Sequence, residues 1–367
     1  MSGEEGIGWA RPARRVGPNL PWRWLPANTE TLVPAAHHLT LILPWATLVM
    51  SAHATGLTRL PLCDWELVAL RASFNSGGWS EWQNHVFFAR LLRRGDAYLT
   101  GIVEGPGAPC WDERAAAVLS AVDELHDGSA ISDTTRARLG RHLTDRQCDE
   151  LRMVTGIYEL IAMVFSTFAP PGELINFEPR TVRALTARHG ARRPRPDKPL
   201  APAAEPSPPR PKTLSVQPDT PPANAAERAW LPRDPTVLTA LARNHRRLAR
   251  LLVSAAKRGV RLRLSEADIE LVVQRTVWRC GPVGEWRARA AVDPEVARVV
   301  GQGPDASGLE PRRAALMRAV DELDTEFFIG DVTWAALTAE FGYDVPRLLE
   351  LCLLVGHYRA FAMLLAP

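Results

Sequence analysis

Three residues in the first half of the chain have the types and spacing for acid–base chemistry. Glu81 and His85 are four residues apart, so on a helix their side chains share one face and can reach each other. Glu66 lies fifteen residues before Glu81. Burial raises the pKa of a carboxyl group, and a neighbouring carboxylate raises the pKa of a histidine. A half-buried Glu–His pair with a second glutamate nearby therefore has the groups needed to move a proton on a substrate.

The surroundings of Glu66 in the sequence are apolar. Its neighbours at helical spacing are Leu62, Cys63, Ala69 and Leu70. A carboxylate on such a stripe either is buried with a partner or borders a pocket. A purely structural role, in which Glu66 caps a neighbouring helix, stays open at this point.

The residues around Glu81 suggest how a substrate is held. Trp79 and Trp82 flank Glu81 and either form an aromatic wall for a planar substrate or pack in the core. Asn84 is the third candidate substrate contact. The Glu81–His85 pair also has an ordinary interpretation, a solvated pair on a helix surface.

The elements around these residues occur twice in the chain. The matched segments are Glu66–Val68 with Glu270–Val272, Glu81–Trp82 with Glu285–Trp286, Ala121–Leu125 with Ala319–Leu323, Ile131–Asp133 with Ile329–Asp331, and Gly156–Tyr158 with Gly356–Tyr358. The two glutamates of each copy are fifteen residues apart. We expect two copies of one domain of about 135 residues each.

Each copy is predicted to be helical. Apolar residues recur at helical spacing in 115–125 and 151–163, and again in 314–323 and 348–364. Asp133 and Asp331 stand where an N-cap is needed, before further helical segments. Because alternating strand-like runs are absent, the sequence predicts an all-α fold built from two tandem helical bundles.

Composition places the domain boundaries. Eleven of the 31 prolines lie between Ala191 and Ala223, a composition that favours a flexible linker. We predict a Trp/Pro-rich arm at residues 1–29 (with Trp9, Trp22 and Trp24), a first repeat at 30–186, a Pro/Arg/Ala-rich linker at 187–230 and a second repeat at 231–367.

Charge and cysteine content exclude several classes of function. The 367 residues carry a net charge of +3, which gives no electrostatic reason to expect a nucleic-acid partner. Five cysteines without a Cys-x-x-Cys pair exclude a disulfide framework and a zinc finger. The longest apolar run, 39–50, contains Pro44 and is too short to span a membrane. We therefore expect a cytoplasmic protein with no membrane partner.

Several strings in the chain match a known helical family. Glu81-Trp82-Gln83-Asn84-His85, Trp111-Asp112-Glu113-Arg114-Ala115, Ala121-Val122-Asp123-Glu124-Leu125 and Gly156-Ile157-Tyr158 resemble the carboxymuconolactone decarboxylase family of the AhpD-like superfamily. The resemblance covers both repeats and implies an all-helical fold.

The resemblance also separates two branches of the superfamily. The peroxidase branch uses a Cys-x-x-Cys pair, and counting back from His85 places those cysteines at Gly78 and Glu81. Both thiols are missing, so thiol peroxidase chemistry is excluded. The resemblance to the decarboxylase-like branch, which works without thiols, implies proton transfer that needs no cofactor and no metal.

The second repeat departs from this pattern. It keeps Glu270 and Glu285, but Arg289 stands in the place of the histidine. Arginine stays protonated and cannot act as a base near neutral pH. We expect the second site to be catalytically degenerate, with Arg289 paired to Glu285 or holding an anionic group.

Three functions follow as hypotheses. The first is a lyase or isomerase that acts on a small carbonyl-bearing substrate through Glu66, Glu81 and His85. The second is a non-catalytic binding or assembly protein on the same fold. The third is a metal-dependent variant in which these three side chains are ligands. In each case the repeats are expected to pack as an intramolecular pseudo-dimer, which further oligomerisation can extend.

Overall fold

The fold is seen in a computed structural model. It describes residues 58–168, 178–189, 229–234, 262–280, 283–342 and 344–365, with single residues between 238 and 253. Within these residues the chain forms thirteen helices and no β-strand. The predicted all-α class is therefore confirmed. The predicted arm at 1–29 and most of the predicted linker at 187–230 lie outside the described residues.

The described helices form two groups, which we call half one (residues 58–189) and half two (residues 229–365). Half one contains α3 (Leu62–Asn75), α4 (Trp79–Leu91), α5 (Asp96–Glu104), α6 (Glu113–Gly128), α7 (Asp133–Leu139), α8 (Asp145–Phe168) and α9 (Arg180–His189). Half two contains α12 (Glu266–Cys280), α13 (Val283–Val292), α14 (Pro294–Gln302), α15 (Pro311–Glu326), α16 (Asp331–Phe341) and α17 (Val345–Leu365). The segments predicted as helices lie within α6, α8, α15 and α17.

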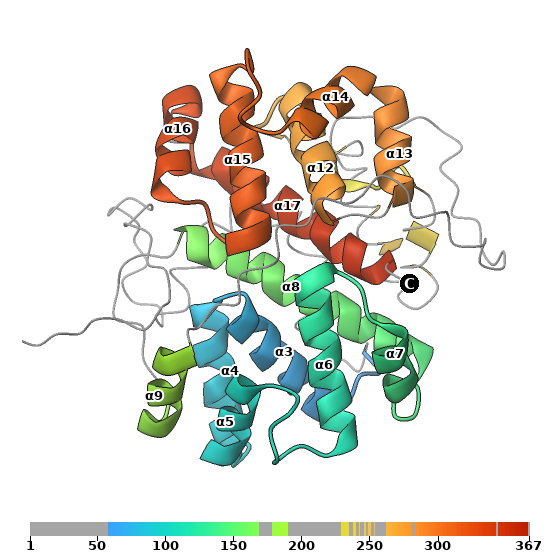
Figure 1. Ribbon diagram of the computed structural model, residues 1–367, viewed down its shortest axis with the longest axis vertical. Coiled ribbons are helices and arrows are strands. Elements are labelled where there is room, and N and C mark those ends of the chain that lie inside the picture. The colour runs from blue at the N-terminus through green and yellow to red at the C-terminus, as the bar shows by residue number, and fades with distance from the viewer. Residues whose placement is uncertain are drawn as a thin grey trace, which may run out of the picture.

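The long helices α8 and α17 pack against each other where the two halves meet (Figure 1). A Cβ atom added to Gly156 would lie 2.7 Å from the Cα of Ala360, and one added to Gly356 would lie 2.7 Å from the Cβ of Leu160. Only glycine permits so close an approach of neighbouring backbone. The glycine of each Gly-x-Tyr segment therefore has the same packing role.

Two described helices are long and apolar enough to cross a membrane by length and composition. They are residues Asp145–Phe168 and Pro346–Leu365, in α8 and α17, and 89% and 94% of their most apolar stretches are buried inside the protein. Core helices of a folded protein have the same length and composition, so these two helices are only weak evidence for a membrane span.

The helix starts correct one prediction. The N-cap of α7 is Ser132, whose hydroxyl accepts a hydrogen bond from the Thr135 N–H, and the N-cap of α16 is Gly330. Asp133 and Asp331 are instead the first residues inside their helices. A carboxylate there is still favourable, because it faces the positive end of the helix dipole.

The acidic residues of the repeated Ala-Val-Asp-Glu-Leu segments hold each half together. Nε of Arg71 donates to Asp123 at 2.7 Å, and Nε of Arg275 donates to Asp321 at 2.8 Å. The adjacent glutamates accept hydrogen bonds at the start of the next helix, Glu124 from Ser132 and Thr135 and Glu322 from Gly330 and Thr333. The same contacts thus occur at corresponding places in both halves.

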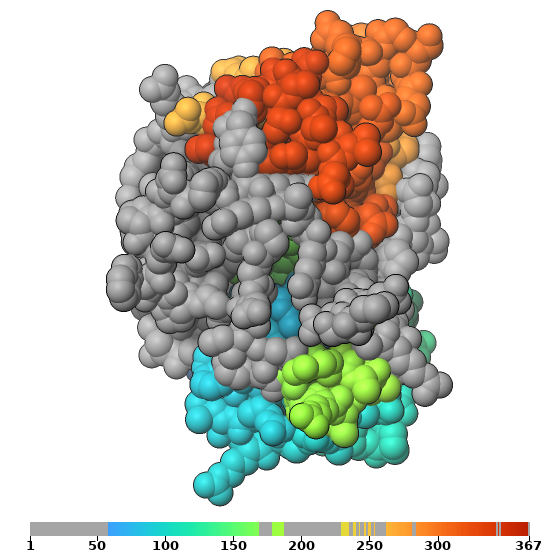
Figure 2. Space-filling model, turned by 90° about the vertical axis from the view of Figure 1, so that its left-hand side faces the viewer, coloured from blue at the N-terminus to red at the C-terminus, as the bar shows by residue number. Residues whose placement is uncertain are grey.

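The ends of the predicted linker differ from the structure. Helix α9 continues to His189, beyond the boundary expected at 186, and lies on the surface against α5 (Figure 2). Ala229 and Trp230, predicted as linker, are buried, and their carbonyls accept hydrogen bonds from α17. These two residues therefore pack as part of half two.

Candidate active site

Helices α3 and α4 bring the sequence-predicted residues of half one together. A tight turn joins the two helices, and Gly77 in it has a φ of 68°, the left-handed region that favours glycine. The next residue, Gly78, approaches α8, where an added Cβ would lie 3.0 Å from the Cβ of Ala162. The Gly-Gly pair thus allows α4 to fold back along α3, so that Glu66 and His85 meet.

Four buried side chains form a continuous row of hydrogen bonds. Nε1 of Trp65 lies 3.3 Å from the Tyr158 hydroxyl, which lies 2.7 Å from Nε2 of His85. Nδ1 of His85 lies 2.8 Å from Oε2 of Glu66. The imidazole is 4% exposed, so these contacts are shielded from water.

The partners in this row favour one tautomer of His85. Trp65 can only donate, so the Tyr158 oxygen accepts its N–H, and the phenol hydrogen can be donated to Nε2 of His85. Burial, reinforced by the carboxylates of Glu81 and Glu66, raises the pKa of Tyr158 well above its usual value, which keeps this phenol protonated. Nε2 of His85 is then the acceptor, and Nδ1 carries the hydrogen that Glu66 receives.

Glu81 lies on the Nε2 side of the imidazole. Its Oε2 is 4.0 Å from Nε2 of His85, and its Oε1 accepts a hydrogen bond from Asn84 at 3.3 Å. The side chain is 15% exposed, so the pair is not a solvated surface pair. Burial raises the pKa of Glu81, against the opposing effects of His85 and of the Asn84 hydrogen bond. A carboxyl group of this kind holds its proton to a higher pH than an exposed glutamate does.

The candidate substrate contacts have different surroundings. Trp82 is completely buried, and its Nε1 donates to Glu178 at 3.1 Å, so its ring reaches no surface. Trp79 is partly buried at the edge of the core. Asn84 is half-buried and contacts Glu81. Of the three, Trp79 and Asn84 keep some exposed area, and Asn84 contacts Glu81.

Tyr158 also lies in the cluster, although it is not among the site residues predicted from the sequence. It lies 73 positions after His85 in the chain, so spacing along one helix gives no sign of the contact. The signal present in the sequence is the recurrence of a tyrosine two residues after the packing glycine in both halves. The close approach of α8 and α17 at Gly156 fixes the turn of α8 from which Tyr158 reaches His85.

The corresponding cluster in half two has the same carboxylates and tyrosine around a guanidinium. Arg289 donates to Glu285 at 2.6 Å, to Glu270 at 3.0 Å and to the Tyr358 hydroxyl at 2.6 Å. Burial works against the charge of Arg289, but Tyr358, Glu285 and Glu270 outweigh it and raise the pKa of the guanidinium. Glu270 also accepts a hydrogen bond from Arg233 at 2.9 Å. Both carboxylates are thus neutralised by arginine.

A cavity of about 230 Å³ adjoins this second cluster. It is lined by Arg233, Glu266, Ala267, Ile269, Glu270, Val292 and Asp293. The polar groups that face it are one guanidinium and three carboxylates, and Arg233 already binds Glu270. The cavity therefore has no excess positive charge with which to hold an anionic substrate.

The metal-dependent alternative does not fit the arrangement in half one. Glu66 binds Nδ1 of His85, whereas Glu81 faces Nε2, so the two carboxylates lie at opposite sides of the ring and do not converge on one point. Among the described residues, no group of three or more His, Cys, Asp or Glu side chains is arranged to hold a metal ion.

Comparison with known proteins adds no relative. No family model, no curated protein and no solved structure matches this chain. The resemblance to the carboxymuconolactone decarboxylase family therefore rests on the short strings quoted above. A proposal about function has to come from the site itself.

Proposed function

We propose that half one is a cofactor-independent acid–base enzyme, a lyase or isomerase that acts on a small carbonyl-bearing substrate. The observation that carries the proposal is the oriented imidazole of His85. Its Nδ1 is bound to a buried carboxylate, and its basic Nε2 faces a second carboxyl group whose pKa is raised. Two titratable groups with different environments are the usual basis of paired acid and base roles.

Each group has a defined part in this proposal. Nε2 of His85 takes a proton from the carbon beside the substrate carbonyl, and Glu81, which has to carry a proton for this role, returns it to the carbonyl oxygen or to a neighbouring carbon. Glu66 keeps the Nδ1 hydrogen bond throughout and stabilises the imidazolium that forms. The Tyr158 hydroxyl is hydrogen-bonded to Nε2, and the substrate would displace that hydrogen bond.

Half two supports the same proposal by contrast. Its guanidinium binds both glutamates and the tyrosine and has no basic atom to offer. Half two would then serve as a structural partner for half one, in keeping with the expected degenerate second site.

The experiment that tests the proposal follows hydrogen exchange instead of a known product. The full-length protein is incubated in D₂O with 2-oxo acids, β-keto acids and γ-lactones, and deuterium incorporation and CO₂ release are followed by NMR. We expect His85→Gln to lower the rate by about 100- to 10,000-fold. Arg289→Gln, the matched change in half two, is expected to alter the rate by less than about threefold, because a guanidinium supplies no base.

Circular dichroism and the unfolding midpoint check that both variants fold. Equal rates for His85→Gln and the unchanged protein would exclude His85 as the base. Equal losses in His85→Gln and Arg289→Gln would indicate that the two clusters matter through stability and not through chemistry.

A second candidate, a non-catalytic binding or assembly protein, is favoured by one observation. Both ring nitrogens of His85 are occupied by protein groups, and the ring is almost completely buried, which also suits a purely structural histidine. On this alternative, none of the compounds exchanges deuterium, and His85→Gln lowers only the unfolding midpoint.

A further inference from the structure

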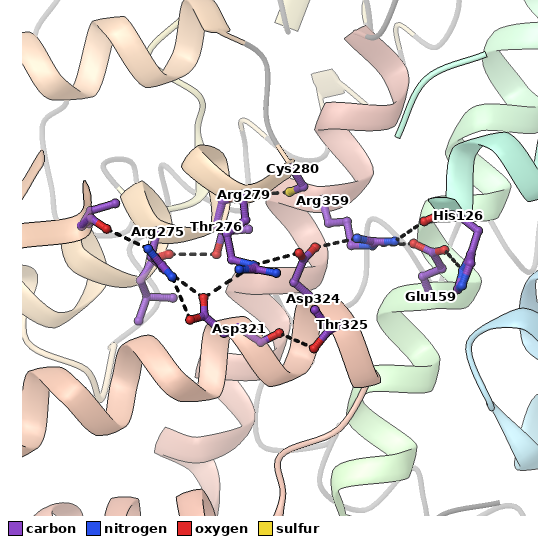
Figure 3. Close-up of polar contacts among 12 residues, drawn as sticks. His126, Glu159, Arg275, Thr276, Arg279, Cys280, Asp321, Asp324, Thr325 and Arg359 are labelled. Atoms are coloured by element: carbon purple, nitrogen blue, oxygen red, sulfur yellow. Dashed lines mark hydrogen bonds and ion pairs between the residues drawn. The ribbon is translucent and has the colours of Figure 1, made fainter. Parts of the chain in front are cut away.

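A row of charged side chains runs from half two into half one (Figure 3). In order along the row, the residues are Arg275, Asp321, Arg279, Asp324, Arg359, Glu159 and His126. Basic and acidic groups alternate throughout. The row thus connects the two halves through side chains that are mostly buried.

The link between the halves is the pair formed by Glu159 of α8 and Arg359 of α17. Nε of Arg359 lies 2.6 Å from Oε2 of Glu159, and the two side chains are 1% and 0% exposed. Burial alone would raise the pKa of Glu159, but Arg359 and His126 outweigh it, and the pKa is lowered. The carboxylate therefore stays ionised in the interior.

This pair lies beside an approximate two-fold axis. Gly156 of half one approaches Ala360 of half two, while Gly356 of half two approaches Leu160 of half one. Such reciprocal contacts are those of an isologous interface, in which each surface would meet its own equivalent. Positions 159 and 359 follow the corresponding tyrosines, so each faces the other across the axis.

At these corresponding positions, an acidic side chain in one half matches a basic side chain in the other. Glu159 corresponds to Arg359, and His126, which binds Glu159, corresponds to Asp324, which binds Arg359. If two copies of half one paired in the same way, two buried carboxylates would face each other. Two copies of half two would place two guanidinium groups together. Like charges held together without water repel each other strongly, so such a pairing is disfavoured.

We propose that this row of charges determines which half binds which. The α8 face of half one binds the α17 face of half two and rejects a second copy of half one, and the α17 face likewise rejects its own copy. Replacing a buried ion pair with apolar residues is often neutral or stabilising. A chain of such pairs at a near-symmetric interface is therefore better explained by partner choice than by stability.

The test measures which halves pair once the chain connection is removed. A protease site is placed in the proline-rich segment at 191–223, the folded protein is cleaved, and the pairs are identified by native mass spectrometry after dilution and reconcentration. We expect mixed pairs of one half each to outnumber like pairs by about 100-fold in the unchanged sequence. In Glu159→Gln/Arg359→Met, in which neither charge remains, like pairs should approach the statistical share.

The matched control is Arg71→Met/Asp123→Asn, which removes a partly buried ion pair within half one and should leave mixed pairs dominant. The same distribution of pairs in all three proteins would overturn the proposal, because shape alone would then select the partner.

A second measurement uses the uncut chain. A double-mutant cycle with Glu159→Gln, Arg359→Met and the double variant compares urea midpoints. We expect the double variant to regain at least half of the summed losses, since no buried charge is left without its partner. Additive losses would contradict a coupled pair at the axis.

Discussion

Glu350 is the residue whose replacement gives the sharpest stability prediction. It is buried near the start of α17, and its carboxylate accepts the backbone N–H of Arg263 at 2.8 Å and that of Leu264 at 3.4 Å, just before α12. Glu150 makes the same contacts in half one, but it has an additional partner, Arg146, at 3.2 Å. The residue four positions before Glu350 is Pro346, which has no side-chain donor.

The expected magnitude follows from the pKa of this carboxyl group. Burial raises the pKa of Glu350 from 4.5 to about 7, against the two backbone hydrogen bonds. Between these values the folded state binds more protons than the unfolded state, so the free energy of unfolding falls as the pH rises. At about 1.36 kcal/mol per pH unit, the full difference is about 3 kcal/mol. The stabilisation is complete below pH 4.5 and is lost as the pH passes 7.

Glu350→Gln removes the titration and keeps one oxygen acceptor for the two N–H groups. Urea unfolding of the unchanged protein and the variant at pH 5 and pH 8 gives two differences in unfolding free energy. We expect the difference in favour of the unchanged protein to be about 2–3 kcal/mol larger at pH 5 than at pH 8. Glu150→Gln is the control, and it should lower stability at both pH values because it weakens three hydrogen bonds. If the difference for Glu350→Gln were equal at pH 5 and pH 8, burial would not control this carboxyl group.

Two further predictions concern packing and the buried row in half one. In thermal unfolding, Gly156→Ala should lower the free energy of unfolding by about 1–3 kcal/mol, because the added methyl group meets the backbone of Ala360. Gly128→Ala should have little effect in the same assay, because nothing lies within 4 Å of the added atom. Tyr158→Phe should lower the free energy of unfolding by about 1–3 kcal/mol, because it removes the donor to His85 and the acceptor of Trp65. A urea midpoint equal to that of the unchanged protein would contradict the hydrogen-bonded row.

The sequence was sufficient for the helical fold because local patterns specify it. The apolar periodicity of 151–163 and 348–364 marks α8 and α17, which are buried along most of their length. The error at Asp133 and Asp331 was a shift of one residue. It arose because serine, glycine and aspartate all suit the first positions of a helix, and side-chain type alone does not choose among them.

The candidate site could be predicted only where its residues lie close together in the chain. Helical spacing indicated the Glu81–His85 pair, and the apolar stripe indicated a buried Glu66. The contacts of His85 with Tyr158 and of Trp82 with Glu178 span 73 and 96 residues, and they depend on how α4, α8 and the segment before α9 pack. Such contacts require the three-dimensional arrangement, as does the 200-residue contact between Glu159 and Arg359.

The two clusters show how one side chain changes the chemistry of an otherwise shared arrangement. A guanidinium has donors enough to bind Glu270, Glu285 and Tyr358 at once, so every carboxylate around it has a counter-charge. An imidazole has two nitrogens, and in half one they are used by Glu66 and Tyr158. Glu81 is therefore left 4.0 Å from the ring, without a full counter-charge, and burial raises its pKa. With histidine in the place of arginine, half one thus has an imidazole beside a carboxyl group whose pKa burial raises, which is why we propose that the acid–base chemistry takes place in half one.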